Sequence, residues 1–133
     1  MFLSLEDVVA RDLGKAARVA HRKSIPLLAS RLDAGEGVDS VTTGIVDRPK
    51  KPVFVLVALT DRRVLVAGAQ RRTGFVRGIA YRELTGVASR RDLLKRGRPL
   101  VLDTGTGSFK VQVTGRKDLD VRIRQLAGLA TPM

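Results

Sequence analysis

The chain has 133 residues, with 25 lysines and arginines against 13 aspartates and glutamates, a formal net charge of +12 and an isoelectric point near 11.4. This length indicates one domain. The apolar fraction of 44% is sufficient for a core without disulfides or metals. With no cysteine and a single histidine, the sequence excludes Cys/His metal sites, thiol redox centres and Cys–His nucleophiles. We therefore expect a basic, non-enzymatic protein without a cofactor.

The amino-terminal sequence also predicts a location. Glu6, Asp7 and Asp12 lie where an export signal would need an uncharged core. The longest apolar run, 53–59, is far shorter than the roughly 20 residues that span a bilayer. Together with the absence of cysteine, these features predict a cytoplasmic protein that does not cross a membrane.

Residues 1–33 are predicted to form an amphipathic helical arm, with Ser4 as the N-cap. The apolar face consists of Leu5, Val8, Val9, Leu13, Ala16 and Ala20, and the opposite face carries a basic stripe of Arg11, Lys15, Arg18 and Arg22. Gly14 allows a break into two shorter helices, and Pro26 should end or kink the pattern after Ser24. Leu27, Leu28 and Leu32 indicate a further helical turn before Asp33.

After Gly37 the apolar period changes from 3.6 to 2, which predicts strands separated by turns. The seven predicted strands are 38–46, 53–59, 63–67, 75–80, 85–90, 99–103 and 108–113. A helix should follow, capped by Thr114, with an apolar stripe of Leu119, Ile123, Leu126 and Ala127. The predicted fold class is mainly β (α+β): an antiparallel barrel or orthogonal sandwich closed by this helix, spanning 34–129, with a frayed tail at 130–133.

Several local motifs resemble those of bacterial pleckstrin-homology-like (PH-like) domains, in particular the small stand-alone type. They are 32–37 (LDAGEG), 59–66 (LTDRRVLV), 79–87 (IAYRELTGV) and 105–113 (GTGSFKVQV), the last leading into 115–118. The resemblance covers about residues 32–128 and implies a seven-stranded PH-like domain. It also implies a tight turn at 60–62, a corner between two sheets at 81–84 and a non-catalytic role in binding lipid headgroups, peptides or proteins.

The positive charge is concentrated in one part of the sequence. Residues 1–40 are neutral overall, whereas 61–100 contain eleven bases and three acids. In an up-and-down meander, the connections after odd-numbered strands emerge at one end. The candidate phosphate-binding residues on these connections are Arg48, Lys50, Lys51, Arg71, Arg72, Arg90, Arg91, Lys95, Arg96 and Arg98. The last connection joins the first two only if the corner near Tyr81 preserves the alternation.

Other motifs have ordinary structural interpretations. The glycines of 105–107 could form a phosphate loop, but strands on both sides favour a hairpin turn. Gly115-Arg-Lys could hold a phosphate at a helix start, although a simple cap is favoured. His21 is expected on the surface, and Asp61, Glu83, Asp92 and Asp103 as ion-pair partners, so no catalytic constellation is predicted.

Our leading hypothesis is a binding module that docks on nucleic acid or nucleoprotein through phosphate contacts, without reading sequence. The aromatic residues are expected mostly in the core, which favours a duplex or structured RNA over stacked single strands. A second hypothesis is binding to an anionic membrane, aided by Leu93 and Leu94 if they are exposed instead of tucked under the barrel. A third is protein binding or homo-oligomerisation through the amino-terminal helix.

Overall fold

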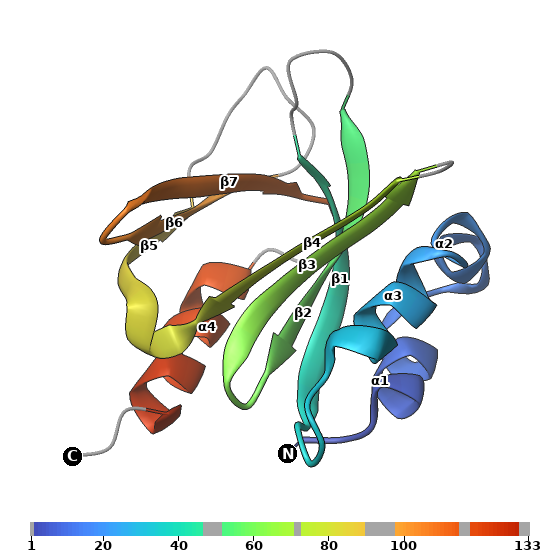
Figure 1. Ribbon diagram of the computed structural model, residues 1–133, viewed down its shortest axis with the longest axis horizontal. Helices are drawn as coiled ribbons and strands as arrows, with labels where there is room; N and C mark the ends of the chain where they lie inside the picture. Colours follow the sequence, from blue (N-terminus) through green and yellow to red (C-terminus); the bar gives the residue numbers. More distant parts are fainter. Residues whose placement is uncertain (1, 47–51, 71–72, 90–97, 115–117, 131–133) are drawn as a thin grey trace.

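A computed structural model describes residues 2–46, 52–70, 73–89, 98–114 and 118–130, and shows one sheet flanked by helices on both sides (Figure 1). The helices are α1 (Leu5–Asp12), α2 (Lys15–Ala20), α3 (Ser24–Arg31), the 3₁₀ turn η1 (Tyr81–Glu83) and α4 (Leu119–Ala130). The strands are β1 (Val38–Val46), β2 (Val53–Thr60), β3 (Arg63–Gln70), β4 (Thr73–Ala80), β5 (Leu84–Ser89), β6 (Arg98–Thr104) and β7 (Gly107–Val113).

The strands form a seven-stranded antiparallel sheet in the order β4-β3-β2-β1-β7-β6-β5. β1 pairs with β2 along its whole length but with β7 only at Gly44 and Ile45. The sheet therefore divides into two halves that diverge from this joint, and α4 lies in the angle between them (Figure 1). Because β4 and β5 remain the two edges, the sheet is an orthogonal sandwich and not a closed barrel. The predicted fold class is confirmed.

The connections that sequence patterns predicted are present. The 60–62 turn joins β2 to β3, and η1 forms the corner that leads into β5. Tyr81 is buried at this corner and its hydroxyl donates to the Thr60 carbonyl at 2.6 Å, which ties the corner to the turn. The 105–107 glycines lie in the β6–β7 hairpin, where Gly107 has a φ of 151°. The hairpin turn that the sequence favoured at this position is therefore confirmed.

The inner core fills the angle between the two halves of the sheet. Its buried residues are Val46, Val55, Val57, Leu59, Val64, Val66, Ile79, Tyr81, Leu100, Leu102, Val111, Val113, Leu119, Ile123 and Leu126. The predicted stripe of α4 is thus buried, with Ala127 partly so. Phe75 of β4 stacks on Phe109 of β7 with ring centroids 6.3 Å apart, so side chains connect the two halves where the backbone does not.

A second apolar cluster lies on the outer face of β1–β4, which α1–α3 cover (Figure 1). Its buried residues are Leu5, Val8, Val9, Leu13, Leu28, Val38, Val41, Leu56, Ala58, Leu65 and Ala67. Residues 1–33 therefore pack against the sheet. The Ser4 side chain accepts from the Asp7 amide, as expected for the N-cap of α1.

Three details of the helices differ from the sequence expectations. Gly14 does separate α1 from α2, but Ala16 and Ala20 are exposed, because α2 runs in a new direction and lacks buried residues. Pro26 ends no helix and instead lies in the first turn of α3, where its missing N–H is not needed. Thr114 is not the cap of α4, which begins at Leu119; its hydroxyl pairs with that of Thr43 at 2.6 Å.

Candidate polyanion-binding end of the sheet

Strand ends from both halves of the sheet meet at one end of the molecule. The last residue of β1, Val46, pairs with Val53, the first of β2. In the other half, Val113 pairs with both Gly44 of β1 and Arg98 of β6, so the start of β6 lies two strands from β1. Adjacent strands are about 4.8 Å apart. The described ends that precede 47–51 and follow 90–97 are therefore close together.

The connection from β3 to β4 lies at the same end of the sheet, because β3 runs antiparallel to β2 and its last residue, Gln70, pairs with Thr73, the first of β4. β7 also ends there, at Val113, before 115–117. The corner at η1 therefore preserves the alternation on which the predicted grouping depended.

Nine predicted phosphate-binding residues lie outside the described residues: Arg48, Lys50, Lys51, Arg71, Arg72, Arg90, Arg91, Lys95 and Arg96. Arg98 begins β6, and Leu93 and Leu94 are likewise outside the described residues.

Most of the excess positive charge lies outside the described residues. The four segments 47–51, 71–72, 90–97 and 115–117 contain eleven of the 25 basic residues and two of the 13 acidic ones. Three-quarters of the net charge of +12 thus belongs to segments that leave a single end of the sheet. The remaining framework is close to neutral. Three of its acids, Asp12, Glu36 and Asp39, bind backbone amides or arginine side chains.

Glu36 forms a buried ion pair beside the β2–β3 turn. Its carboxylate accepts from Arg63 of β3 at 2.8 and 3.0 Å, from the Thr60 hydroxyl at 2.6 Å and from the Asp33 amide at 2.9 Å. Burial alone would raise the pKa of Glu36, but the hydrogen bonds from Arg63, Thr60 and Asp33 outweigh it and lower the pKa to about 2. This acid therefore stays ionised and is neutralised locally. Sequence reasoning did not identify the pair.

Two further acids attach helices to β1. Asp39 accepts from the Arg122 guanidinium of α4, with Nε–Oδ2 at 3.1 Å and a second bond from Nη2 to Oδ1. Asp12 of α1 accepts from the Val41 amide at 3.0 Å, while Arg11 donates to Asp12 and to the Asp39 carbonyl. These side chains occupy the edge of β1 that β7 does not reach. The hydrogen bond from Arg11 to Asp12 raises the pKa of Arg11, and the hydrogen bonds from Arg122 to Asp39 raise the pKa of Arg122.

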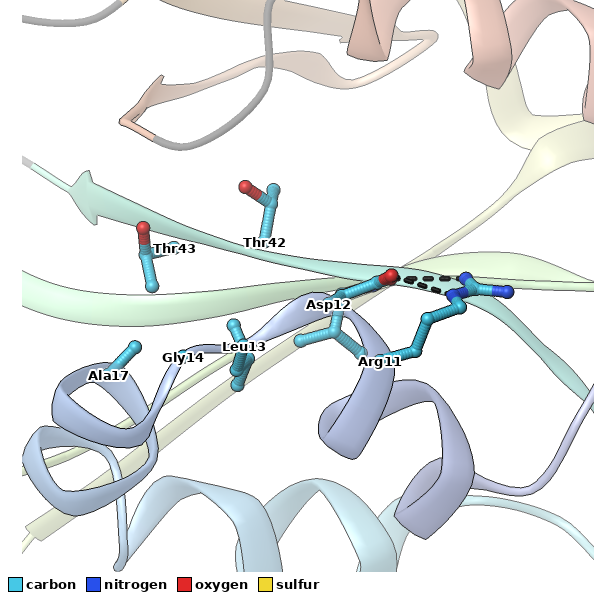
Figure 2. Close-up of a pocket in the computed structure, with 8 residues that line it drawn as sticks. Arg11, Asp12, Leu13, Gly14, Ala17, Thr42 and Thr43 are labelled. Atoms are coloured by element: carbon cyan, nitrogen blue, oxygen red, sulfur yellow. Dashed lines mark hydrogen bonds and ion pairs between the residues drawn. The ribbon is translucent and has the colours of Figure 1, made fainter.

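The predicted basic stripe is therefore divided. Arg11 is held by acidic and carbonyl oxygens on β1, whereas Lys15, Arg18 and Arg22 are exposed on α2 and the turn after it. The four basic residues do not share one helix face, because the helix breaks at Gly14. A surface cavity of about 540 Å³ opens at this break, lined by Arg11, Asp12, Leu13, Gly14, Ala17, Val41, Thr42 and Thr43 (Figure 2). The Arg11–Asp12 pair lies at its wall beside β1 (Figure 2).

His21, expected on the surface, is buried at the end of α2. Burial lowers its pKa, so its neutral form is favoured by desolvation, whereas the sequence suggested neighbouring charge as the cause. Among the described residues, no three histidine, aspartate or glutamate side chains group to hold a metal ion. Within the same residues, no helix is long and apolar enough to cross a membrane.

The aromatic residues are less buried than predicted. Phe54 is 58% exposed and Phe2 is 40% exposed, whereas Phe75 and Phe109 are partly buried against the inner core. The expectation that the aromatic residues lie mostly in the core thus holds for Tyr81, Phe75 and Phe109 but not for Phe54 and Phe2. The sequence carried a signal for Phe54, because it alternates with the inner-facing Val53 and Val55 and so faces the other side of β2.

This fold, a bent seven-stranded antiparallel sheet with a carboxy-terminal helix in its angle, is PH-like. One similar solved structure is a complex of PDZ-RhoGEF DH/PH domains with GTP-γ-S-activated RhoA, with a TM-score of 0.52 and 16% identity. That match covers 96% of this chain and 39% of the other. Another is the carboxy-terminal domain of an unknown protein from Leishmania infantum, with a TM-score of 0.53, 15% identity and coverage of 85% and 96%.

At these identities the two structures share the fold alone with this chain. By sequence, neither a family model nor a curated protein matches it. The comparisons therefore define the class of architecture of this chain and nothing of its chemistry.

Proposed function

We propose that this protein is a non-catalytic binding module that docks the basic end of its sheet on nucleic acid or a nucleoprotein, mainly through phosphate contacts. The observation that carries the proposal is the convergence of the β1, β3 and β7 ends and the β6 start at one end of a nearly neutral framework. The segments that continue from these strand ends hold eleven basic residues.

The residue types suit a polyphosphate. Six of the seven bases in 47–51, 71–72 and 90–91 are directly adjacent to another base, which concentrates charge over a few residues. Arginine also binds phosphate oxygens through two parallel hydrogen bonds. Such contacts fix position without reading base sequence. We therefore propose binding without sequence specificity. From the motif resemblance, we further propose that the protein is a bacterial PH-like domain of the small stand-alone type that acts in the cytoplasm.

The salt dependence of binding tests this proposal. If about six bases contact duplex phosphates, the logarithm of the binding constant should fall with the logarithm of salt concentration with a slope of roughly −5. Fluorescence anisotropy with labelled duplex and single-stranded oligonucleotides at several salt concentrations measures this slope. Binding that is absent, or insensitive to salt, would contradict the proposal.

A pair of charge variants locates the contact. Arg71→Ala/Arg72→Ala should weaken binding and reduce the size of the slope by one to two, because two phosphate contacts are removed. The matched control is Arg18→Ala/Arg22→Ala, which removes the same charge from α2 and the following turn and should leave the slope nearly unchanged. Equal losses in both variants would indicate attraction by net charge without a binding face. Flotation with anionic and neutral vesicles distinguishes the membrane alternative.

A further inference from the structure

The outer face of the sheet is covered by helices over only part of its width. α1–α3 pack on Leu56, Ala58, Leu65 and Ala67 of β2 and β3. Phe54 lies on the same face of β2, two residues before Leu56, yet it is 58% exposed. The helical cover therefore ends between Phe54 and Leu56, and a large aromatic ring is left on an open sheet surface.

The strand register shows what surrounds this ring. Phe54 pairs with Ile45 of β1, Ile45 with Gln112 of β7, and Gln112 with Pro99 of β6. Paired residues point to the same side of a sheet, so these four side chains form one row across four strands. Ile45, Gln112 and Pro99 are each partly exposed. We call this row, 99–112–45–54 in register order, the outer row.

Lys110 places a cation beside the outer row. It lies two residues before Gln112 on β7, so both side chains share the outer face, and Lys110 is exposed. Asp103 of the same face pairs with Ser108 farther toward the β6–β7 turn and accepts a hydrogen bond from that hydroxyl. Among the described residues of β1, β2, β6 and β7 on this face, Lys110 is thus the charged residue closest to the row in register. The outer row begins beside the strand ends that lead into the basic segments.

We propose that Phe54 stacks on an unpaired base, so that the nucleic acid bound by this protein is single-stranded. The proposal rests on the function proposed above and specifies its ligand. Gln112 in the row and Lys110 beside it are placed to contact the sugar–phosphate backbone or a base edge. Aromatic side chains on an open sheet surface with basic residues around them are a common platform for unpaired bases.

Nucleic acid fits this surface better than a lipid bilayer does. A ring that inserts into a membrane has to protrude beyond the polar groups around it. Phe54 instead lies within a strand, one position from Val53 and Val55 in a regular ladder with β1. The same face of the sheet also carries the amide of Gln112 and the ammonium group of Lys110. A flat base stacks on such a surface without displacing these polar groups.

A tryptophan reporter tests the stacking directly. The chain contains no tryptophan, so Phe54→Trp introduces a single indole at the proposed contact. Val19→Trp serves as the matched control, because Val19 is similarly exposed at 54% but lies on α2. Titration with an unlabelled oligothymidylate of about 20 nucleotides should quench the emission of Phe54→Trp at least twofold more strongly than that of Val19→Trp. Equal quenching in the two variants would overturn the proposal.

A second variant measures the contribution to affinity. Phe54→Ala should weaken binding of the single strand about tenfold, the range found when one stacked aromatic is removed, and should weaken duplex binding less than twofold. Its salt slope should equal that of the wild type, because no charge is removed. Val19→Ala is the control, and circular dichroism establishes that each variant is folded.

The outcomes separate this proposal from the one on which it rests. Salt-dependent binding that prefers duplex, or that Phe54→Ala leaves unchanged, overturns the stacking proposal and leaves the basic module intact. No binding of either nucleic acid by the wild type overturns both. A blue shift of the Phe54→Trp emission with anionic vesicles, together with no binding of either nucleic acid, overturns both in favour of a membrane surface.

Discussion

Arg63 of β3 binds both carboxylate oxygens of Glu36, with its Nη2 2.8 Å from Oε1 and its Nε 3.0 Å from Oε2. Glu36 belongs to the segment between α3 and β1, so this pair fixes the amino-terminal helices to the central sheet. The same Arg63 side chain also donates to the Arg31 carbonyl at the end of α3 at 2.6 Å. One arginine of β3 therefore holds both the end of α3 and the segment that follows it, about 30 residues earlier in the sequence.

This pair should make stability depend on pH in the acid range. The pKa of Glu36 is lowered from 4.5 to about 2, so the folded state binds this proton less readily than the unfolded state. The stabilisation is complete above pH 4.5 and is lost as the pH falls toward 2, by up to about 3 kcal/mol. Urea unfolding at pH 7, 4 and 2.5 measures it. Glu36→Gln should cost about 3 kcal/mol at pH 7 and flatten this acid dependence; an unchanged profile would contradict the assignment.

His21 should act in a separate, higher pH window. Its pKa is lowered by burial, so the unfolded state takes up this proton first. Stability attributable to His21 is present above its ordinary pKa of about 6.5 and is lost as the pH falls below that value. Unfolding at pH 7.5 and 5.5 should show the decrease in the wild type and not in His21→Gln. A decrease of equal size in both proteins would show that another group is responsible.

Removal of the Tyr81 hydroxyl should destabilise the fold without affecting binding. Its hydrogen bond to the Thr60 carbonyl is buried and joins the corner at η1 to the β2–β3 turn. Tyr81→Phe leaves that carbonyl without this donor, at a cost of about 1.5 kcal/mol in unfolding free energy. Ser30→Ala, which removes an exposed hydroxyl bonded to the Leu27 carbonyl, is the control and should cost less than half as much. Equal costs would mean that the corner is not held by this bond.

The narrow joint between the two halves of the sheet should be sensitive to one added methyl group. A Cβ at Gly44 would lie 2.9 Å from the Gln112 carbonyl oxygen and 2.9 Å from Val111 Cγ2. Because β1 and β7 pair only at Gly44 and Ile45, the strands would have to separate at their joint. Gly44→Ala should lower the unfolding free energy by about 2 kcal/mol. Gly105→Ala, where a Cβ meets nothing within 4 Å, should change it by less than about 0.5 kcal/mol.

The sequence determined most of the local structure of this protein. Period-2 alternation placed all seven strands to within a few residues, and the turn at 60–62 and the hairpin at 105–107 followed from residue types that favour turns. The segregation of charge into a few segments was also readable directly. These features depend on neighbours in the chain, because strand propensity, turn chemistry and charge count require no knowledge of the rest of the molecule.

Only the tertiary structure decided which faces are covered and which charges are paired. Alternation shows that Phe54 and Leu56 share a face, but not that the helical cover ends between them. The burial of His21 and the Glu36–Arg63 pair both depend on how α1–α3 pack on the sheet. The two residues of that pair are 27 positions apart in the sequence. A one-dimensional pattern specifies the direction of a side chain, whereas its exposure depends on which distant element packs against it.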